Sequence, residues 1–431
     1  MDKTVAICTL GCKVNQYESE AVLEQFIRLG YQVVDFSEAA SVYVVNTCTV
    51  THLSDRKSRQ MIRRAKQQNP HSVLIVMGCY AQIEPDAVAA IPGVDLVLGT
   101  AERSRAAAMA ESLMEAAGPL NLVAETACDF EPLTIDGSAQ EHTRAVLKVQ
   151  DGCNQFCSYC IIPYARGRIR SRSISDTVLE AKRLVAAGFS ELVLTGIHLA
   201  SWGKDSGEGT LLTLLYALSE IDGLERIRLG SLEPTLCDDA FVSGAASLPK
   251  VCHHFHLSLQ SGCDKTLRRM NRKYTAEDYR QAVMRIRALM PDAAITTDVI
   301  VGFPQETEAE FAETFRFLED ISLCDVHVFK FSPRKGTPAA TMAGQVAPAV
   351  KEERSRRLIG QAAKKNEMFA RGFLAKEEPV LFEQQVRPGV YEGKTTQYLT
   401  VHVASEQDLT GLIKPVCIRA YQDGVLTGTL L

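Results

Sequence analysis

Short β-branched runs alternate with longer amphipathic segments along most of the 431 residues of this chain. Apolar residues recur every three to four positions in the longer segments, as in helices that pack on a sheet. Such alternation predicts strand-helix-strand units with parallel strands, and therefore an amino-terminal α/β domain over residues 1–117. We expect its strands at 4–8, 42–45, 73–77 and 96–98, and its helices at 17–29, 55–68, 85–90 and 103–116.

The alternation restarts after residues 118–142, a stretch with Pro119, Pro132 and Gly137 and no sustained periodicity, which we interpret as a linker. Six strand-like runs separated by helix-length gaps predict an open, partial (β/α)6 barrel over 143–368. These runs are 146–149, 192–195, 227–229, 256–259, 295–301 and 326–331. After a helix at 349–369, short alternating strands at 380–382, 398–402, 415–419 and 424–429 predict a small all-β barrel over 369–431.

Composition narrows the class of protein. The chain is 46% hydrophobic and 23% charged, which is ordinary for a folded globular protein. Its start, MDKTVAICTLGC, contains neither the apolar core of a signal peptide nor a spanning helix, so we expect a cytoplasmic location and no membrane partner. The net charge of -5 does not by itself indicate a nucleic-acid partner. We expect no DNA partner, and any RNA site has to be a local basic patch.

The strongest chemical signal is the run DGCNQFCSYCIIP, directly after the first barrel strand. In a reducing compartment, its three cysteines are better interpreted as metal ligands than as disulfide partners. Three thiolates on one loop can bind three irons of a four-iron cluster and leave the fourth iron open to a substrate. A zinc site is the alternative, but zinc requires a fourth ligand and none lies nearby. The three residues are Cys153, Cys157 and Cys160.

A second set of cysteines follows three strands of the first domain. Cys12, Cys48 and Cys79 each come just past the carboxyl end of an expected parallel strand. Ligands bind at that edge of an open α/β sheet, so the three thiols can converge although they are far apart in sequence. A second cluster with one open iron is the functional interpretation. The alternative is three buried cysteines that act as small apolar residues.

These motifs resemble the radical S-adenosylmethionine (SAM) superfamily, and within it the methylthiotransferase family along essentially the whole chain. LTGIHLASWG, LGSLEP, HLSLQSGCDK, TTDVIVGFPQET and FKFSPRKGTPA follow the cysteine loop in order. The resemblance implies that the cofactor SAM is contacted by residues of these motifs. They are Gly196, His198, Ser231, Glu233, Gln260, Asp298, Val301, Gly302, Phe303 and Pro304.

The same resemblance implies two 4Fe-4S clusters and SAM as cofactors, with all six cysteines as catalytic cluster ligands. One SAM would donate a methyl group to sulfur held at the cluster of Cys12, Cys48 and Cys79. Another would be cleaved at the cluster on the barrel loop, and its radical would take hydrogen from C2 of an adenine. An electron donor such as flavodoxin or ferredoxin is expected, and the sequence does not identify the sulfur source.

The expected substrate is N6-threonylcarbamoyladenosine at position 37, in the anticodon stem-loop of transfer RNA (tRNA). GCKVNQYES around Cys12 most resembles the branch of the family with that target. Other branches methylthiolate prenylated adenosine 37 or an aspartate of a ribosomal protein. An alternative of a different class is an iron-sulfur protein that binds RNA or delivers sulfur without radical catalysis.

Three basic runs, DRKSRQMIRRAK, PYARGRIRSRS and LRRMNRK, flank the cysteine loops. A charge run is usually a solvated surface, but three of them beside two cluster loops favour a phosphate-binding rim. The expected RNA contacts are Arg56, Arg59, Arg63, Arg166, Arg168, Arg170, Arg172 and Arg334. Arg166 or Arg334 is the expected partner of the threonylcarbamoyl carboxylate. The terminal barrel resembles the TRAM-type RNA-binding barrel of RNA-modifying enzymes.

Overall fold

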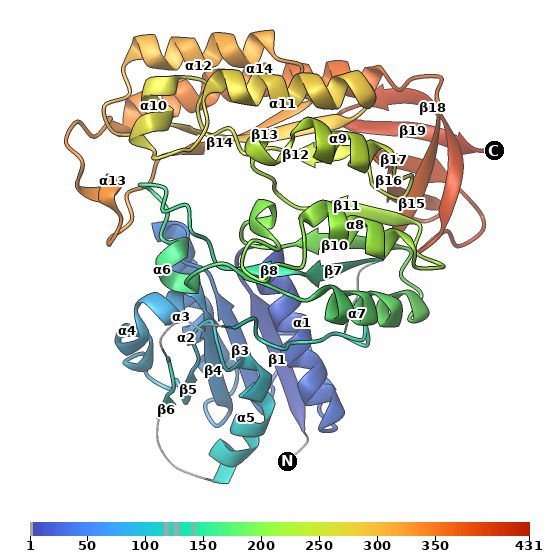
Figure 1. Ribbon diagram of the computed structural model, residues 1–431. Coiled ribbons are helices and arrows are strands. Elements are labelled where there is room, and N and C mark those ends of the chain that lie inside the picture. The colour runs from blue at the N-terminus through green and yellow to red at the C-terminus, as the bar shows by residue number, and fades with distance from the viewer. Residues whose placement is uncertain (1–2, 116–119, 125–128, 140–142) are drawn as a thin grey trace.

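The computed structural model describes residues 3–115, 120–124, 129–139 and 143–431. In Figure 1 an amino-terminal α/β domain lies below an open barrel, and a small β-barrel at the carboxyl end packs beside the open barrel. The mixed α/β fold with a closed terminal β-barrel confirms the predicted fold class.

The amino-terminal domain is a six-stranded parallel sheet in the order β2-β1-β3-β4-β5-β6. Every residue of β3 and β4 is buried, as their unbroken apolar runs predict. Helices α1 and α5 cover one face, and α2, α3 and α4 cover the other. The strands are β1 (Thr4–Thr9), β2 (Gln32–Val33), β3 (Val42–Thr47), β4 (Val73–Gly78), β5 (Leu96–Val97) and β6 (Leu120–Asn121). The helices are α1 (Lys13–Arg28), α2 (His52–Gln68), α3 (Cys79–Ile83), α4 (Pro85–Ala89), η1 (Arg103–Arg105) and α5 (Ala106–Glu115).

Part of the stretch expected to be a linker is ordered into the fold. Strand β6 extends the amino-terminal sheet, and Leu133 and Ile135 are buried in the core of the open barrel. The predicted linker at 118–142 also covers 118–119, 125–128 and 140–142, which lie outside the described residues. The described segments of this stretch therefore pack against both neighbouring domains.

The open barrel consists of two three-stranded parallel sheets, β11-β10-β7 and β12-β13-β14. Isolated parallel bridges, Ile227 to Val251 and Leu232 to Leu257, join the two sheets. The strands are β7 (Arg144–Lys148), β10 (Glu191–Thr195), β11 (Arg226–Leu229), β12 (His254–His256), β13 (Ala294–Val301) and β14 (Asp325–Lys330), with a small hairpin of β8 (Gln150–Asp151) and β9 (Arg170–Ser171). The partial (β/α)6 architecture is present as predicted.

Helices cover the outer face of the open barrel (Figure 1). Several begin at capping residues; Thr307 and Glu310, for example, form a capping box at the start of α12. The helices are α6 (Ile162–Arg166), α7 (Ile174–Ala186), η2 (Leu199–Ser201), α8 (Leu211–Ser219), η3 (Pro234–Leu236), α9 (Asp239–Ala246), α10 (Asp264–Arg269), α11 (Ala276–Leu289), α12 (Glu308–Asp320), α13 (Pro338–Thr341) and α14 (Pro348–Arg371).

The terminal domain is a closed five-stranded barrel in the order β15-β16-β17-β19-β18. Its strands are β15 (Glu377–Arg387), β16 (Val390–Lys394), β17 (Thr400–Ala404), β18 (Ile413–Gln422) and β19 (Val425–Leu430). It docks on the open barrel through two arginines of β11. Arg226 donates to the backbone carbonyls of Pro379 and Lys394 at 2.6 and 3.1 Å, and Arg228 donates to those of Thr396 and Thr395 at 2.9 and 3.2 Å.

A buried charge network joins the amino-terminal domain to the open barrel. Glu18 of α1 is fully buried and pairs with Arg103 at 2.6 Å, Arg166 at 2.7 Å and Lys148 at 2.8 Å. Lys148 and Arg166 also pair with Asp151, at 2.6 and 3.2 Å. Burial opposes ionisation of Glu18, but the three cations outweigh it and lower its pKa to about 2. The two domains are therefore held together by charges shielded from water.

Candidate functional site

Cys12, Cys48 and Cys79, the amino-terminal trio, meet at the carboxyl edge of the first sheet. They follow β1, β3 and β4, which are direct neighbours in the sheet order. Burial raises the pKa of the Cys48 thiol, and negative charge on Cys12 raises it further. Burial raises the pKa of Cys79 to about 12, and the other two thiols add to this shift. The three sulfur atoms therefore lie within electrostatic reach of one another.

A glycine permits the close approach of the first two strands of this site. Gly11 has a φ of +116°, and a Cβ atom there would lie 3.2 Å from the Cys48 sulfur. A side chain at this position would be strained and would crowd the thiol. The loop that carries Cys12 can therefore pass directly beside Cys48.

The amino-terminal trio is linked to the open barrel by Arg166. This arginine is fully buried at the end of α6, the helix that follows the barrel cysteine loop. Its Nε donates to the Cys79 sulfur at 3.2 Å, and its Nη2 donates to Asn15 at 2.9 Å. Asn15 Oδ1 lies 3.5 Å from the Cys12 sulfur. One guanidinium group thus stabilises negative charge on a thiol of the other domain.

Cys153, Cys157 and Cys160, the barrel trio, lie on the loop after β8. Burial raises the pKa of Cys153 to about 11 and that of Cys160 to about 12, with a further contribution from the charge of Cys157. Arg272 Nη1 donates to the Cys157 sulfur at 3.2 Å. Each trio therefore has one sulfur that accepts a hydrogen bond from a buried arginine.

The donor sets fit polynuclear clusters better than single zinc ions. Each site offers three thiols, whereas a structural zinc site needs four ligands. Sulfur atoms around one tetrahedral zinc lie about 3.8 Å apart. Among the residues that the structure describes, no three cysteine sulfurs lie within 4.8 Å of one another. A single zinc ion therefore does not fit either trio, and binding an iron-sulfur cluster would require deprotonation of thiols, of which Cys48, Cys79 and Cys157 are buried.

The motif residues after β10 and β11 form a hydrogen-bonded chain beside the barrel trio. His198 contacts Ser201 through Nδ1 at 2.6 Å and Glu233 through Nε2 at 2.9 Å. Glu233 also pairs with Arg272 at 2.9 Å. This chain ends at the sulfur of Cys157, to which Arg272 donates. The structure thus brings His198 and Glu233 together, while Ser231 is exposed and Gly196 lies against Gln150.

The remaining motif residues lie on and after β13. Gln260 has a φ of +69°, an unusual conformation for a side-chain-bearing residue, and its backbone bonds on both sides to β13. Gly302 also has positive φ, and its N–H donates to Glu306 at 2.6 Å. Val301, Gly302, Phe303 and Pro304 are buried, so any contact they make with a cofactor is through their backbone or the turn they form.

A cavity of about 230 Å³ lies between the two trios. Cys160 of the barrel trio borders it on one side, and Val50 and Thr51, just after Cys48, border it on the other. Asp298 and Phe329 of the barrel strands complete part of its wall. A small planar group placed here would contact the surroundings of both cysteine sites.

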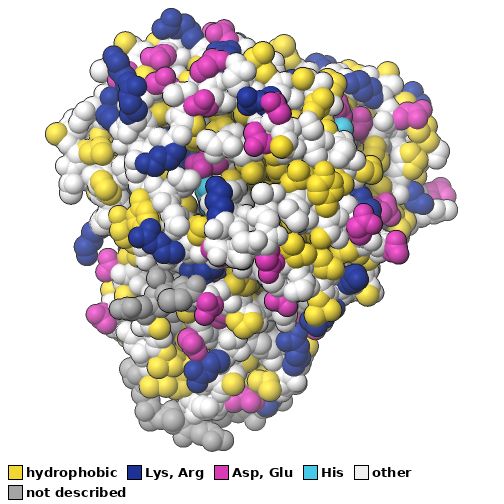
Figure 2. All heavy atoms as spheres, in the orientation of Figure 1, with side chains coloured by type: hydrophobic (Ala, Val, Ile, Leu, Met, Phe, Trp, Pro, Cys, Tyr) yellow, Lys and Arg dark blue, Asp and Glu magenta, His cyan; other side chains and the backbone are white. Residues whose placement is uncertain are grey.

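The expected arginine rim needs correction. Arg166, Arg170, Arg172 and Arg334 are buried and engaged with carboxylates of the protein. Since phosphate contacts require accessible guanidinium groups, these four are not free to serve as RNA contacts, and neither Arg166 nor Arg334 is free for a substrate carboxylate. Arg56, Arg63 and Arg168 are exposed, and Arg59 is half-buried against Tyr80. On the face of the molecule drawn in Figure 2, Lys and Arg are interspersed with Asp and Glu.

Comparison with known proteins identifies the family. The model described as Uncharacterized protein family UPF0004 matches residues 4–99, and the Radical SAM superfamily model matches 147–318. The threonylcarbamoyladenosine tRNA methylthiotransferase MtaB of Bacillus subtilis (strain 168) is 42% identical over 425 residues, which cover 96% of this chain and 93% of that protein. The chain belongs to the radical SAM methylthiotransferase family. The predictions of an enzyme that uses SAM and 4Fe-4S clusters are thereby confirmed.

Two further comparisons place this methylthiotransferase among its relatives. The tRNA-2-methylthio-N(6)-dimethylallyladenosine synthase of Roseobacter denitrificans is 36% identical over 427 residues, with 96% of each chain covered. The radical SAM methyltransferase TsrM of Kitasatospora setae, solved with cobalamin and a 4Fe-4S cluster, matches with a TM-score of 0.57 at 16% identity over 79% of this chain and 77% of that chain. The latter likeness supports the fold alone. None of the helices described here has the length and apolarity to cross a bilayer.

Proposed function

We propose that this enzyme converts N6-threonylcarbamoyladenosine at position 37 of tRNA to its 2-methylthio derivative. The supporting observation is the 42% identity to the Bacillus subtilis threonylcarbamoyladenosine enzyme along 96% of the chain. The dimethylallyladenosine synthase compared above reaches 36%. Prenylated adenosine is therefore the second candidate substrate.

The six cysteines are the proposed cluster ligands, three for each cluster. When bound, the barrel cluster supplies the electron that cleaves SAM, and the amino-terminal cluster holds the sulfur to be transferred. Arg272 and Arg166 donate to one sulfur of each trio and so stabilise the thiolate form. Proposals that complete this assignment are a flavodoxin or ferredoxin as reductant and a cytoplasmic location.

SAM is proposed to bind beside the barrel trio. The hydrogen-bonded chain of His198 and Glu233 is held in place by Ser201 and Arg272, so its carboxylate and imidazole present fixed polar atoms. The remaining proposed contacts are Gly196, Ser231, Gln260, Val301, Gly302, Phe303 and Pro304. Asp298, expected from the same resemblance to contact SAM, remains a proposed contact and also pairs with His256 at 3.2 Å.

The target adenine is proposed to enter the cavity between the two trios. Its apolar walls, including Ile300 and Phe331, exclude water from the reacting carbon. Val50 and Phe329 are 54% and 52% exposed, so a base that enters the cavity would cover apolar surface of both. Because Cys160 and the residues just after Cys48 border this cavity, an adenine carbon placed there would lie near both cysteine sites.

Nucleoside mass spectrometry of tRNA tests the proposal. Deletion of the gene should remove 2-methylthio-N6-threonylcarbamoyladenosine, and the wild-type gene should restore it, whereas the Cys157→Ala and Cys48→Ala genes should not. Loss of the prenylated methylthio nucleoside instead would show that the second candidate is the substrate. If both nucleosides persist in the deletion strain, a tRNA substrate is refuted and a protein aspartate becomes the leading target.

A further inference from the structure

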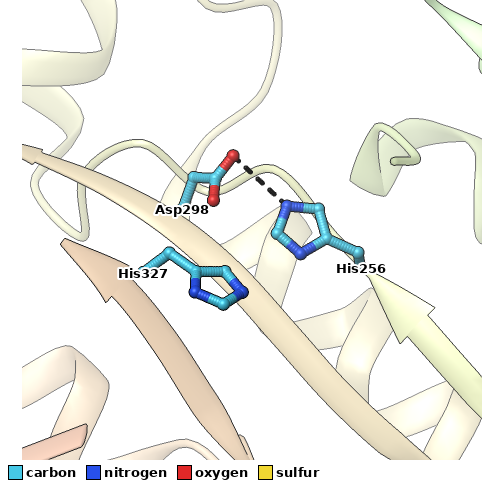
Figure 3. Close-up of side chains that lie close together, drawn as sticks. All are labelled: His256, Asp298 and His327. Carbon is cyan, nitrogen blue, oxygen red and sulfur yellow. Dashed lines mark ion pairs between the residues drawn. The ribbon is translucent and has the colours of Figure 1, made fainter. Parts of the chain in front are cut away.

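Three polar side chains that belong to neither cysteine trio meet on the inner wall of the open barrel. They are His256 of β12, Asp298 of β13 and His327 of β14, which we call the polar cluster (Figure 3). One ligand atom of each lies within 4.8 Å of those of the other two. His256 Nε2 is 3.2 Å from Asp298 Oδ2, and the two imidazole rings are 5.6 Å apart.

The polar cluster is oriented by the barrel itself. His256 Nδ1 forms a hydrogen bond with Thr296 Oγ1 at 2.8 Å, which directs Nε2 toward Asp298. The parallel register places Asp298 directly beside His327 on the neighbouring strand. His327 is exposed, and no described residue forms a hydrogen bond with its ring. The cluster therefore offers an imidazole and a carboxylate oxygen to a ligand in the barrel.

The polar cluster adjoins the cavity proposed for the adenine. Asp298 belongs to both. Alternation along β14 places His327 and Phe329 on the same inner face, while Val328 packs toward the barrel core. Two residues of a strand span about 6.6 Å. A base stacked on Phe329 would therefore have its edge within reach of His327.

We propose that the polar cluster binds the N6 substituent of the target nucleoside while the adenine stacks on Phe329. This inference rests on the proposed function. The threonylcarbamoyl group carries a carboxylate, which the imidazoles of His327 and His256 can bind, and a hydroxyl, which can donate to Asp298. The substituent therefore offers one anionic group and one hydroxyl donor, and the polar cluster offers two imidazole donors and one carboxylate acceptor.

The same wall disfavours a prenyl group. A dimethylallyl substituent has no polar atom, so it would cover Asp298 and His327 without replacing their hydrogen bonds to water. Sites built to bond a polar substituent discriminate strongly against analogues that lack it, because buried polar groups are left unpaired. The polar cluster is therefore a specificity site as well as a binding site.

Binding to two tRNAs tests the inference. Cluster-reconstituted enzyme is titrated with tRNA that carries either N6-threonylcarbamoyladenosine or unmodified adenosine at position 37, and Kd is measured for each. The wild type should prefer the modified tRNA by about tenfold or more, the value of a hydrogen bond to a charged group. His327→Phe should bring the ratio of the two Kd values close to one and leave Kd for unmodified tRNA unchanged.

Two further variants make this comparison decisive. His71→Phe changes an exposed histidine of the amino-terminal domain in the same way and should keep the wild-type ratio. His327→Leu, a smaller replacement, should reproduce the effect of His327→Phe and serves if the phenylalanine variant fails to take up iron. A general loss of folding would weaken binding of both tRNAs equally and leave the ratio unchanged.

The possible outcomes separate this inference from the proposed function. If the wild type forms no methylthio product on the threonylcarbamoyl tRNA, the proposed function fails. If product forms but the wild type has no preference, or the His327 variants keep it, the polar cluster does not bind the substituent. A divalent metal ion would also overturn the inference: one equivalent of zinc in the wild type, lost in His327→Phe with unchanged iron, would show a metal site.

Discussion

Replacing Glu18 with glutamine tests whether the buried charges hold the two large domains together. Glutamine keeps the shape of the side chain but leaves Arg103, Lys148 and Arg166 with one buried anion fewer. The pKa of Glu18 is lowered from 4.5 to about 2, which at about 1.4 kcal/mol for each pKa unit corresponds to ~3 kcal/mol of stability at neutral pH. Breaking a buried ion pair typically costs about 3–5 kcal/mol, which agrees.

Urea unfolding measures this loss. The single tryptophan, Trp202, is a suitable probe because it is buried and its Nε1 donates to the Arg172 carbonyl at 3.1 Å. With a urea dependence of roughly 3 kcal/mol per molar, the Glu18→Gln midpoint should fall by about 1 M. Circular dichroism followed in parallel checks that both probes report one transition.

The difference in stability between the wild type and Glu18→Gln should depend on pH in a direction that the pKa of Glu18 determines. A carboxyl whose pKa is lower in the folded state than in the unfolded state stabilises the fold when the pH is above its unfolded-state pKa. This stabilisation is lost as the pH falls toward its folded-state pKa. The difference between wild type and variant should therefore be equal at pH 8 and pH 6 and narrow below about pH 4.5. The matched control, Glu111→Gln, removes a surface pair with Lys3 and should leave the midpoint unchanged. Equal midpoints for the two variants would refute the reasoning.

Four other substitutions, with their controls, probe the cysteine sites and the proposed RNA surface. Arg272→Gln removes the hydrogen bond to Cys157, so the reduction potential of the barrel cluster, titrated by electron paramagnetic resonance, should fall by about 60 mV or more; an unchanged potential would show that this bond does not tune it. Cys48→Ala and Cys157→Ala should each lower bound iron to about half, while Cys237→Ala, at a buried site outside both trios, should keep the wild-type content; equal iron in all three would contradict the assignment. Arg168→Ala should weaken tRNA binding and reduce the slope of log K against log salt by about 1, whereas Arg316→Ala on α12 should change neither; a wild-type slope for Arg168→Ala would remove it from the interface.

The convergence of the amino-terminal trio is predictable from sequence because it depends on one general rule. Each cysteine follows an apolar run, and the carboxyl ends of neighbouring parallel strands lie at one edge. The sheet order places β1, β3 and β4 side by side, so the rule applies to all three. Local pattern and sheet geometry are sufficient in this case.

The burial of the arginines in the basic runs is not predictable from sequence in the same way. The run PYARGRIRSRS has the composition of a charged surface segment. Arg166 is nevertheless buried, because it pairs with the Glu18 carboxylate, which lies 148 residues earlier in the chain. Helix α1 packs on the first sheet with one side and on the open barrel with the other, so it buries acidic residues that its pattern assigns to solvent. Partners that are distant in sequence therefore determine whether these charged side chains are buried, and the local sequence does not indicate which partners they have.

The polar cluster shows a similar limit at shorter range. His256 lies near an expected strand end, and His327 lies within an expected strand. Their meeting with Asp298 depends on the register of β12, β13 and β14, which the strand runs alone do not specify.

The strand pattern of the terminal barrel does not predict β16. Its residues Val390–Lys394 have little β-branched character, and closure of the barrel supplies their pairing with β15 and β17.

The docking of the terminal barrel has a consequence for how such enzymes can diversify. Arg226 and Arg228 donate hydrogen bonds to backbone carbonyls, and every residue type has the same carbonyl oxygen. These four bonds therefore depend on the path of the chain at 379 and 394–396, while the side chains of Glu383, Gln397 and Tyr398 add contacts with Arg144, Asp292 and Arg228. A terminal barrel attached in this way can exchange residues on its outer surface, away from Glu383, Gln397 and Tyr398, without losing its contacts with the open barrel.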